Sequence, residues 1–328
     1  TLYKSTNNDL YLKLSGDPLL SSSDLSQLVA SAKLKNIEPK TFYIDDKVFD
    51  CVEWGEGWQW DDEMNPLMPK FSAYNLDKNL LKIEINPTSD KRPAVISVKP
   101  FYPLTFINLL TTDSTVPTNV KFEKNNDIAS NLINVSGTVA KLHTVMMPVT
   151  NPKMNFSLRL ESAIRNKKLE YFAPFKNAKL PEKNVYVVDF VEHEIEPIIS
   201  GILKNSNNLY AETLFKTAGA VFSGSVGSRE TSLDMLNNYL SKIGVNSEDI
   251  KVVGGSGVSK NNLVTTDFMS DFLVMKSKDD NFDSFKTMLP TSGEGTLKDR
   301  MLYFKNNLYA KTGTLSDTSS IAGYITSR

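Results

Sequence analysis

Two patterns of apolar residues follow each other within the first fifty residues: an alternation with polar residues and then a helical spacing. Leucines alternate with polar residues over 9–14, which predicts a half-buried strand that ends in a turn at 15–18. Helix N-cap candidates follow at 21–24, before apolar residues at helical spacing. These apolar residues are Leu25, Leu28, Val29 and Ala32. With the apolar run at 41–44, the pattern predicts a strand–helix–strand unit.

Strand patterns dominate the middle of the chain. Alternation returns over 79–86, and between about 93 and 160 short apolar runs are separated by Pro, Asn, Thr and Gly without a helical period. This pattern of short apolar runs predicts a small, mostly β module. The segment 185–191 is nearly continuous in β-branched and aromatic residues, which predicts a buried strand.

Helical spacing dominates from residue 196 onward. Three segments have this spacing: 196–204, 208–222 and 231–243. Strand character returns at 308–310 and 321–325, around a polar turn at 314–320. Helices gathered between strands predict an α/β organisation for the C-terminal part.

Length and charge narrow the function classes. The 328 residues suffice for about two domains. The chain has 37 Lys and Arg residues and 38 Asp and Glu residues, which gives a net charge of −1. It therefore has no excess of positive charge with which to bind nucleic-acid phosphates or anionic lipid. No apolar stretch reaches the roughly 18–20 residues of a membrane-spanning helix. The single cysteine, Cys51, excludes an internal disulfide, which fits a reducing cytosol and equally an exported protein stabilised by its cores.

The chain is poor in the residues that most often carry metal and acid–base chemistry. His143 and His193 are the only histidines, and neither lies at a metal-ligand spacing, so we expect no metal site and two surface or structural histidines. An acyl-transfer reaction would need another base, and lysine is the usual substitute.

The segment Lys311-Thr312-Gly313-Thr314 is the first candidate site. On an edge strand that faces a cleft, a lysine ammonium neutralises a substrate carboxylate and a threonine hydroxyl donates to it. Gly313 has no Cβ and lets an extended substrate approach the backbone. This combination suits a peptide C-terminus, whereas the alternative interpretation is a solvated lysine at a strand end.

Ser206 and Asn208 form the second candidate, directly before a predicted helix. In the functional interpretation, the Ser206 hydroxyl relays a proton between a lysine and a leaving amine, and the Asn208 amide holds a substrate peptide group. In the structural interpretation, Ser206 is the N-cap of the helix. Neither candidate decides the function by itself.

Several segments, in this order, resemble one family. The sequence resembles the low-molecular-mass class C penicillin-binding proteins, which are D-alanyl-D-alanine carboxypeptidase/endopeptidases of the S-x-x-K serine acyltransferase superfamily. Besides the two candidate sites, the segments are L-S-G-D-P at 14–18, G-W-Q-W-D-D at 57–62, N-L-Y-A-E at 208–212, G-S-G-V-S at 255–259, N-L-V-T at 262–265, L-P at 289–290, G-T-L at 295–297 and A-G-Y-I at 322–325. The resemblance is thin between 93 and 183.

The resemblance implies a penicillin-recognising (β-lactamase-like) α/β domain with an inserted α/β domain that carries a small β-rich domain. The expected divisions are 1–95 with 161–184 for the inserted α/β domain, 96–160 for the β-rich domain and 185–328 for the C-terminal part of the catalytic domain. No serine in the sequence has a lysine three positions later, so the family's nucleophile motif would precede Thr1. The family also continues with at least one further sheet strand after the one predicted at 321–325, so we expect a catalytic domain that is incomplete at both ends.

The resemblance also implies a serine DD-peptidase that acts on peptidoglycan stem peptides through an acyl-enzyme and is inhibited by β-lactams. Ser206 would pass a proton to the departing D-alanine, Asn208 would hold the substrate amide, and Lys311 would complete the catalytic set. The substrate-binding residues would be Thr312, Gly313 and Thr314. No cofactor or metal is implied, and the protein would be exported to the periplasm or bacterial cell surface.

Two other functions compete with this one. A relative that has lost the nucleophile would serve as a peptidoglycan-binding or scaffolding protein, and a β-lactamase would need deacylation machinery that the sequence does not reveal. Trp58 and Trp60 also have two interpretations, because such aromatic residues stack on glycan or, more often, fill a core.

Overall fold

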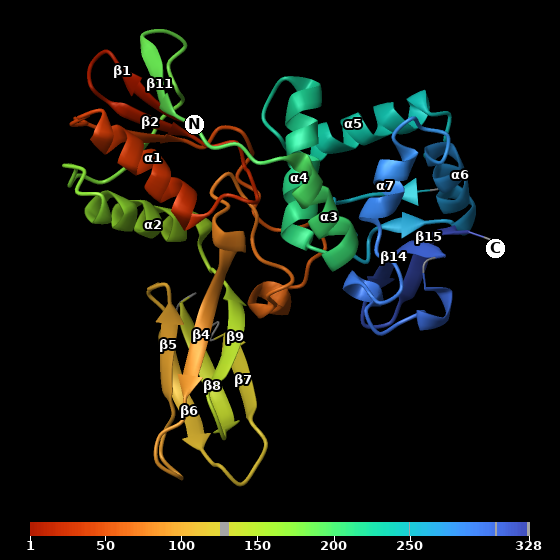
Figure 1. Ribbon diagram of the computed structural model, residues 1–328, viewed down its shortest axis with the longest axis horizontal. Coiled ribbons are helices and arrows are strands. Elements are labelled where there is room, and N and C mark those ends of the chain that lie inside the picture. The colour runs from red at the N-terminus through yellow and green to blue at the C-terminus, as the bar shows by residue number, and fades with distance from the viewer. Residues whose placement is uncertain (125–130, 249, 306, 327–328) are drawn as a thin grey trace.

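The chain forms three parts that are separate in Figure 1, a computed structural model that describes residues 1–124, 131–248, 250–305 and 307–326. The first part contains a five-stranded sheet and two helices. The second part contains two three-stranded sheets, and the third contains helices and a β-hairpin. The side chain of Trp60 lies outside the described part, and none of the described helices has the length and apolarity needed to span a bilayer.

The first sheet has the strand order β10-β3-β2-β1-β11, and α1 and α2 pack against it in one core. The elements are β1 (Leu2–Ser5), β2 (Leu10–Lys13), α1 (Ser22–Leu34), β3 (Phe42–Asp45), α2 (Pro152–Asn166), β10 (Lys176–Asn177) and β11 (Val185–Asp189). The predicted strand–helix–strand unit is confirmed, because β2 and β3 pair in parallel on either side of α1 in the chain. Ser21 and Asp24 close a capping box at the start of α1.

Helix α2 corrects the sequence analysis, which predicted no helix between about 93 and 160. The side chain of Asn151 caps α2 by accepting from Met154 N at 2.9 Å, and Pro152 occupies the first helical position. The buried face packs into the core of the first part; its apolar members include Phe156, Leu160, Ala163 and Ile164. Burial against the sheet and α1 therefore stabilises a helix in an otherwise β-rich stretch.

Strand β11 is also a correction, because the predicted buried strand lies at a sheet edge. Among the described strands it pairs with β1 alone. Tyr186 and Val187 are 64% and 54% exposed, and Val188 alone of this strand is buried in the core. Since β11 completes the first sheet, we propose that the C-terminal part begins after Asp189 instead of at residue 185.

The second part encloses its own core between the sheets β5-β4-β9 and β6-β8-β7. Its strands are β4 (Leu80–Asn86), β5 (Val95–Lys99), β6 (Thr105–Thr112), β7 (Asn119–Lys124), β8 (Leu132–Val139) and β9 (His143–Pro148). Alternation in β4 buries Leu81, Ile83 and Ile85 in this core. We therefore propose that the β-rich unit begins at β4, before the expected boundary at 96. Strand β9 pairs antiparallel with β4, with Leu80 opposite Pro148.

The third part contains five α-helices among its described residues. Its elements are α3 (Ile195–Asn205), α4 (Asn208–Ser223), α5 (Arg229–Lys242), β12 (Ile250–Lys251), β13 (Leu263–Val264), α6 (Thr266–Lys276), α7 (Phe282–Met288), β14 (Leu308–Thr314) and β15 (Ser319–Ile325). The short 3-10 helices of the chain are η1 (Trp60–Met64), η2 (Asp77–Asn79), η3 (Gly295–Leu297) and η4 (Leu302–Phe304). The helices predicted within 196–243 and both late strands are confirmed, whereas α6 and α7 were not predicted.

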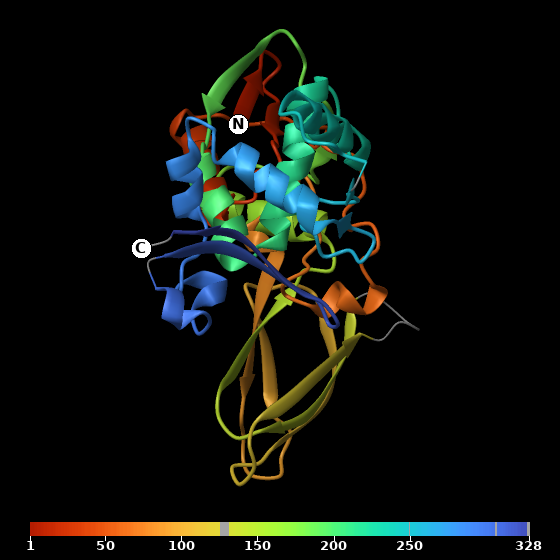
Figure 2. The same ribbon diagram turned by 90° about the vertical axis from the view of Figure 1, so that its right-hand side faces the viewer.

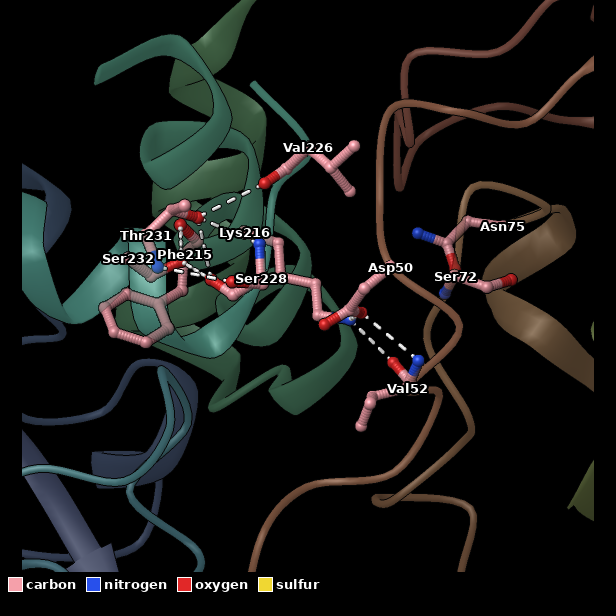
Figure 3. A network of polar contacts seen from close by, with 10 residues as sticks. All are labelled: Asp50, Val52, Ser72, Asn75, Phe215, Lys216, Val226, Ser228, Thr231 and Ser232. Carbon is pink, nitrogen blue, oxygen red and sulfur yellow. Dashed lines mark hydrogen bonds and ion pairs between the residues drawn. The ribbon is translucent and has the colours of Figure 1, made fainter. Parts of the chain in front are cut away.

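Helix α4 joins the third part to the segments that follow β3 (Figure 3). The buried Lys216 donates hydrogen bonds to the Asp50 carboxylate and, at 2.6 Å, to Val52 O. Asn75, which is fully buried, donates to Thr213 Oγ1 at 2.9 Å. These bonds fix the position of the helix on which one candidate site residue, Asn208, lies.

Candidate active site

Ser206 lies in the sharp turn between α3 and α4. It is the C-cap of α3 and has a left-handed backbone conformation, with φ 53° and ψ 46°. Asn207 is the N-cap of α4, because its side chain accepts from Tyr210 N at 3.0 Å. The N-cap interpretation of Ser206 is therefore wrong. Its hydroxyl is directed to a different partner.

That partner is Lys311 on strand β14. The Lys311 ammonium donates hydrogen bonds to Ser206 Oγ and, at 2.5 Å, to Thr312 O. Figures 1 and 2 show the hairpin of β14 and β15 beside α3 and α4. The structure thus brings together two of the predicted site residues from segments far apart in the chain.

The surroundings of Lys311 disfavour its charged form. Burial lowers the pKa of the Lys311 ammonium below its ordinary value of 10.5. No carboxylate of the described residues forms an ion pair with it, and its hydrogen-bond partners are a hydroxyl and a backbone carbonyl. Such an ammonium retains the capacity to bind an incoming anion or to give up a proton.

Asn208 is the first residue of α4 and is half-buried. Its side-chain amide donates to Leu67 O at 2.9 Å, so in this structure the amide is engaged with the loop that follows η1. Asn208 lies two positions after Ser206. No hydrogen bond links it to Ser206 or Lys311 in the described part of the chain.

The remaining predicted residues lie along the end of β14. Thr312 is buried and Thr314 is exposed at the last position of the strand. A Cβ on Gly313 would lie 2.5 Å from Ser320 Oγ of β15, an exposed side chain that can rotate away, so the hairpin alone does not require a glycine at this position. The prediction that an extended substrate passes Gly313 stays a prediction.

Strand β14 has one edge that is open beyond Ala310. It pairs antiparallel with β15 along its whole length, and on the other edge Ala310 N donates to Pro290 O at 3.0 Å. From Lys311 to Thr314, no strand among the described residues pairs with that second edge. An extended peptide can add to an edge of this kind through backbone hydrogen bonds.

Glu212 is a buried polar residue that the sequence analysis did not single out. It lies one helical turn after Asn208, is 4% exposed and accepts hydrogen bonds from Gly255 N and Ser256 N, both at 3.0 Å. Two signals in the sequence could have found it: Glu212 ends the segment N-L-Y-A-E at 208–212, and it is a carboxylate among the apolar residues of a predicted helix.

A cavity of about 280 Å³ lies farther along α4. Its lining includes Glu212 and Lys216, but neither Ser206 nor Lys311. The cavity is therefore separate from the contact between the two candidate segments.

Trp58 is buried and packs in a core cluster with Phe71, Leu209 and Tyr210. The core interpretation is therefore confirmed for Trp58, while the side chain of Trp60 lies outside the described residues. His193 Nδ1 lies 2.6 Å from the Asp17 carboxylate, where it links the segment after β11 to the turn after β2.

Comparison with known proteins identifies the family. A family model described as the D-Ala-D-Ala carboxypeptidase 3 (S13) family matches residues 3–328. The chain belongs to this family. The resemblance drawn from the spaced sequence segments is thereby confirmed.

The S13 chain is also similar to curated carboxypeptidases along nearly all of its length. It is 26% identical to a D-alanyl-D-alanine carboxypeptidase of Actinomadura sp. (strain R39), over 97% of this chain and 63% of that protein. It is 22% identical to the D-alanyl-D-alanine carboxypeptidase DacB of Haemophilus influenzae, over 98% of this chain and 69% of that protein. The chain thus spans about two thirds of the length of these relatives.

A solved structure confirms the fold class of this S13 chain. Penicillin-binding protein 4 (dacB) from Haemophilus influenzae superposes with a TM-score of 0.83 and 21% identity, over 99% of this chain and 76% of that chain. The fold is a penicillin-recognising α/β fold with additional domains.

Proposed function

We propose that this chain forms the substrate groove of a serine DD-peptidase. The enzyme removes D-alanine from peptidoglycan stem peptides, or cleaves after it, through an acyl-enzyme. The contact between Lys311 and Ser206 carries the proposal, because it joins an ammonium of lowered pKa to a hydroxyl beside an open strand edge.

In the proposed reaction, the attacking serine and its lysine base belong to the family's S-x-x-K motif, which these 328 residues do not contain. The serine adds to the carbonyl of the penultimate D-alanine, and the backbone N–H of Thr314 helps to hold the oxyanion. Ser206 passes a proton to the departing D-alanine amine. Water then releases the acyl group from the serine.

Substrate binding in this proposal uses the end of β14 and the start of α4. The hydroxyls of Thr312 and Thr314 and the ammonium of Lys311 bind the terminal carboxylate. Asn208 exchanges its bond to Leu67 O for the substrate amide. Because two neighbouring ammonium groups disfavour each other's charge, Lys311 also helps the motif lysine to act as a base.

The same groove explains the proposed inhibition by β-lactams. A β-lactam presents a carboxylate and a reactive carbonyl in the places of the peptide groups, and its acyl-enzyme hydrolyses slowly. One solved structure of the Haemophilus influenzae penicillin-binding protein 4 contains a β-lactam, which supports such binding by a protein of this fold. Since the substrate is cell-wall peptide, we also propose export to the periplasm or bacterial cell surface.

Labelling with fluorescent penicillin tests the proposal. The protein expressed from its complete gene is incubated with the probe, and we expect one covalent label that unlabelled penicillin prevents. The 328-residue chain alone is the matched control and should not label, because it contains no S-x-x-K serine.

Failure of a folded, complete protein to label would overturn the peptidase proposal. The absence of an S-x-x-K motif from the complete gene would instead favour the scaffolding function, which pull-down on purified peptidoglycan would detect. Rapid release of the label with hydrolysis of free penicillin would favour a β-lactamase.

A further inference from the structure

Glu212 is a buried carboxylate whose hydrogen bonds all reach one loop. Its Oε2 accepts from Gly255 N at 3.0 Å, and its Oε1 accepts from Ser256 N at 3.0 Å and from Ser256 Oγ at 2.6 Å. No cationic side chain of the described residues forms an ion pair with it. The carboxylate therefore acts as an anchor for a backbone segment, since charged acceptors form the stronger hydrogen bonds to N–H groups.

The loop lies directly against α4 because two glycines permit it. A Cβ on Gly254 would lie 2.9 Å from Glu212 Oε1, and a Cβ on Gly255 would lie 2.6 Å from both Ala211 O and Phe215 Cβ. A side chain at position 255 would push the loop away from the helix, and one at position 254 would displace the Glu212 carboxylate. The close approach of the loop to α4 and the three hydrogen bonds of Glu212 thus depend on each other.

The far end of the same loop reaches the hairpin that carries Lys311. Val258 packs against the core cluster that includes Leu209 of α4. Two residues later, Lys260 Nζ lies 3.1 Å from the Asp317 carboxylate, in the turn between β14 and β15. This exposed ion pair contributes little energy, but it shows where the loop ends. Residues 254–260 therefore span from α4 to the tip of the hairpin.

We propose that Glu212 is a positioning residue for the groove. By holding residues 254–260 against α4, its carboxylate keeps Lys260 within reach of Asp317, and so biases the position of the β14–β15 turn relative to the helix and, through it, the contact between Lys311 and Ser206. Glu212 touches neither of these residues, so it acts through the loop. The catalytic consequence rests on the proposed peptidase function, whereas the anchoring of the loop does not.

Glu212→Gln tests the anchor, because an amide has one acceptor oxygen in place of two and adds a donor that faces N–H groups. Hydrogen exchange followed by mass spectrometry should show at least tenfold faster exchange at Gly255 and Ser256. It should also show faster exchange at Leu315, whose N–H closes the hairpin turn onto Thr318 O. Glu230→Gln is the matched control, because Glu230 lines the same cavity and is exposed.

Penicillin acylation of the protein from the complete gene gives the second readout. We expect Glu212→Gln to lower the first-order acylation rate constant about tenfold, with a change below threefold in the concentration that gives half the maximal rate. Ser256→Ala removes one of the three hydrogen bonds and should have an intermediate effect in a folded protein. A purely structural role would lower stability and leave the acylation rate of the folded protein unchanged.

Four results separate the possible outcomes. Unchanged exchange at Gly255 and Ser256 in Glu212→Gln would overturn the inference, and so would faster exchange there without a change at Leu315. An unchanged acylation rate in a loosened loop would also overturn it. If the unaltered protein is not labelled by penicillin at all, the peptidase proposal fails. Hydrogen exchange at Leu315 in Glu212→Gln then decides by itself whether Glu212 positions the hairpin.

Discussion

Lys311 donates a hydrogen bond to Ser206 across 105 positions of the chain. The contact fixes strand β14 beside the turn between α3 and α4, and it places an ammonium against a serine that has a left-handed backbone. A left-handed conformation costs a non-glycine residue about 1–2 kcal/mol. The fold therefore holds Ser206 in a strained conformation at the point where Lys311 meets it.

Ser206→Ala should lower penicillin acylation of the complete protein about 10²- to 10⁴-fold, the typical contribution of a positioned proton-transfer group. The melting temperature should change little, because Asn207 caps α4 and Lys311 keeps its bond to Thr312 O. Stopped-flow labelling and calorimetry measure the two effects. Ser225→Ala, at an exposed serine after α4, is the control, and an equal loss of rate in both variants would contradict the assignment.

Lys311→Met should abolish most acylation and change the pH dependence of stability. Burial lowers the pKa of Lys311 in the folded state, so between that value and about 10.5 the unfolded chain binds the additional proton. The free energy of unfolding therefore rises with pH in this window, and Lys311→Met should remove that part of the rise. Urea unfolding at several pH values measures it. An identical pH profile in both proteins would show that Lys311 is not desolvated.

Lys216→Met should mainly lower stability, in contrast to the two variants above, which mainly lower acylation. Lys216 is buried and paired with Asp50, so its loss leaves that carboxylate without its cation. Because Asp50 is 27% exposed, we expect a loss of about 2–3 kcal/mol, below the 3–5 kcal/mol for fully buried pairs. Urea unfolding measures the loss, and Asp50→Asn with Lys216→Met should recover part of it. A variant as stable as the parent would contradict the role of this pair.

Asn207→Ala should destabilise the protein by about 1 kcal/mol, because α4 loses its N-cap. Asn207→Asp keeps an acceptor for Tyr210 N and should stay near the parent. Thermal unfolding compares them. Equal stability of the alanine and aspartate variants would mean that the cap contributes nothing.

Asp113→Asn should reduce the acid dependence of the β-rich unit. Its ion pair with Lys91 and the donors of Thr115 lower the pKa of Asp113 to about 2. This contribution is present above the ordinary value of 3.8 and is lost as the pH falls from 3.8 toward 2. The difference in unfolding free energy between parent and variant should therefore vanish near pH 2. A difference that persists there would contradict the electrostatic origin.

Sequence patterns within a single segment correctly predicted the elements whose signals lie within that segment. The alternation in β2 and β4 and the capped, amphipathic α1 needed no distant partner to be recognised. The apolar run in β11 was misinterpreted, since whether a strand is central or at an edge depends on which strands pair with it. Helix α2 was missed because its stability comes from packing against α1 and the sheet.

The candidate site could be predicted in residue type but not in geometry. The sequence and its family resemblance pointed to Ser206, Asn208 and Lys311, yet they did not reveal that Asn207 takes over the cap. Glu212 ends the segment N-L-Y-A-E and Gly255 begins the segment G-S-G-V-S, but neither segment reveals that the carboxylate accepts from backbone N–H groups about forty positions away. Such partners leave no pattern in the sequence.

The pairing of β4 with β9 means that the chain enters and leaves the β-rich unit at one place. Leu80 and Pro148 lie opposite each other, at an interstrand distance of about 5 Å. The unit also contacts the rest of the chain, because Met64 of η1 and Met154 and Leu158 of α2 pack against its core, and Lys124 of β7 pairs with Glu63 of η1. A short turn joining the two strands at this point would close the backbone without rerouting it, but it would also remove the support of η1, whose following loop accepts the hydrogen bond of Asn208 at Leu67 O. The β-rich unit thus reaches the groove through η1.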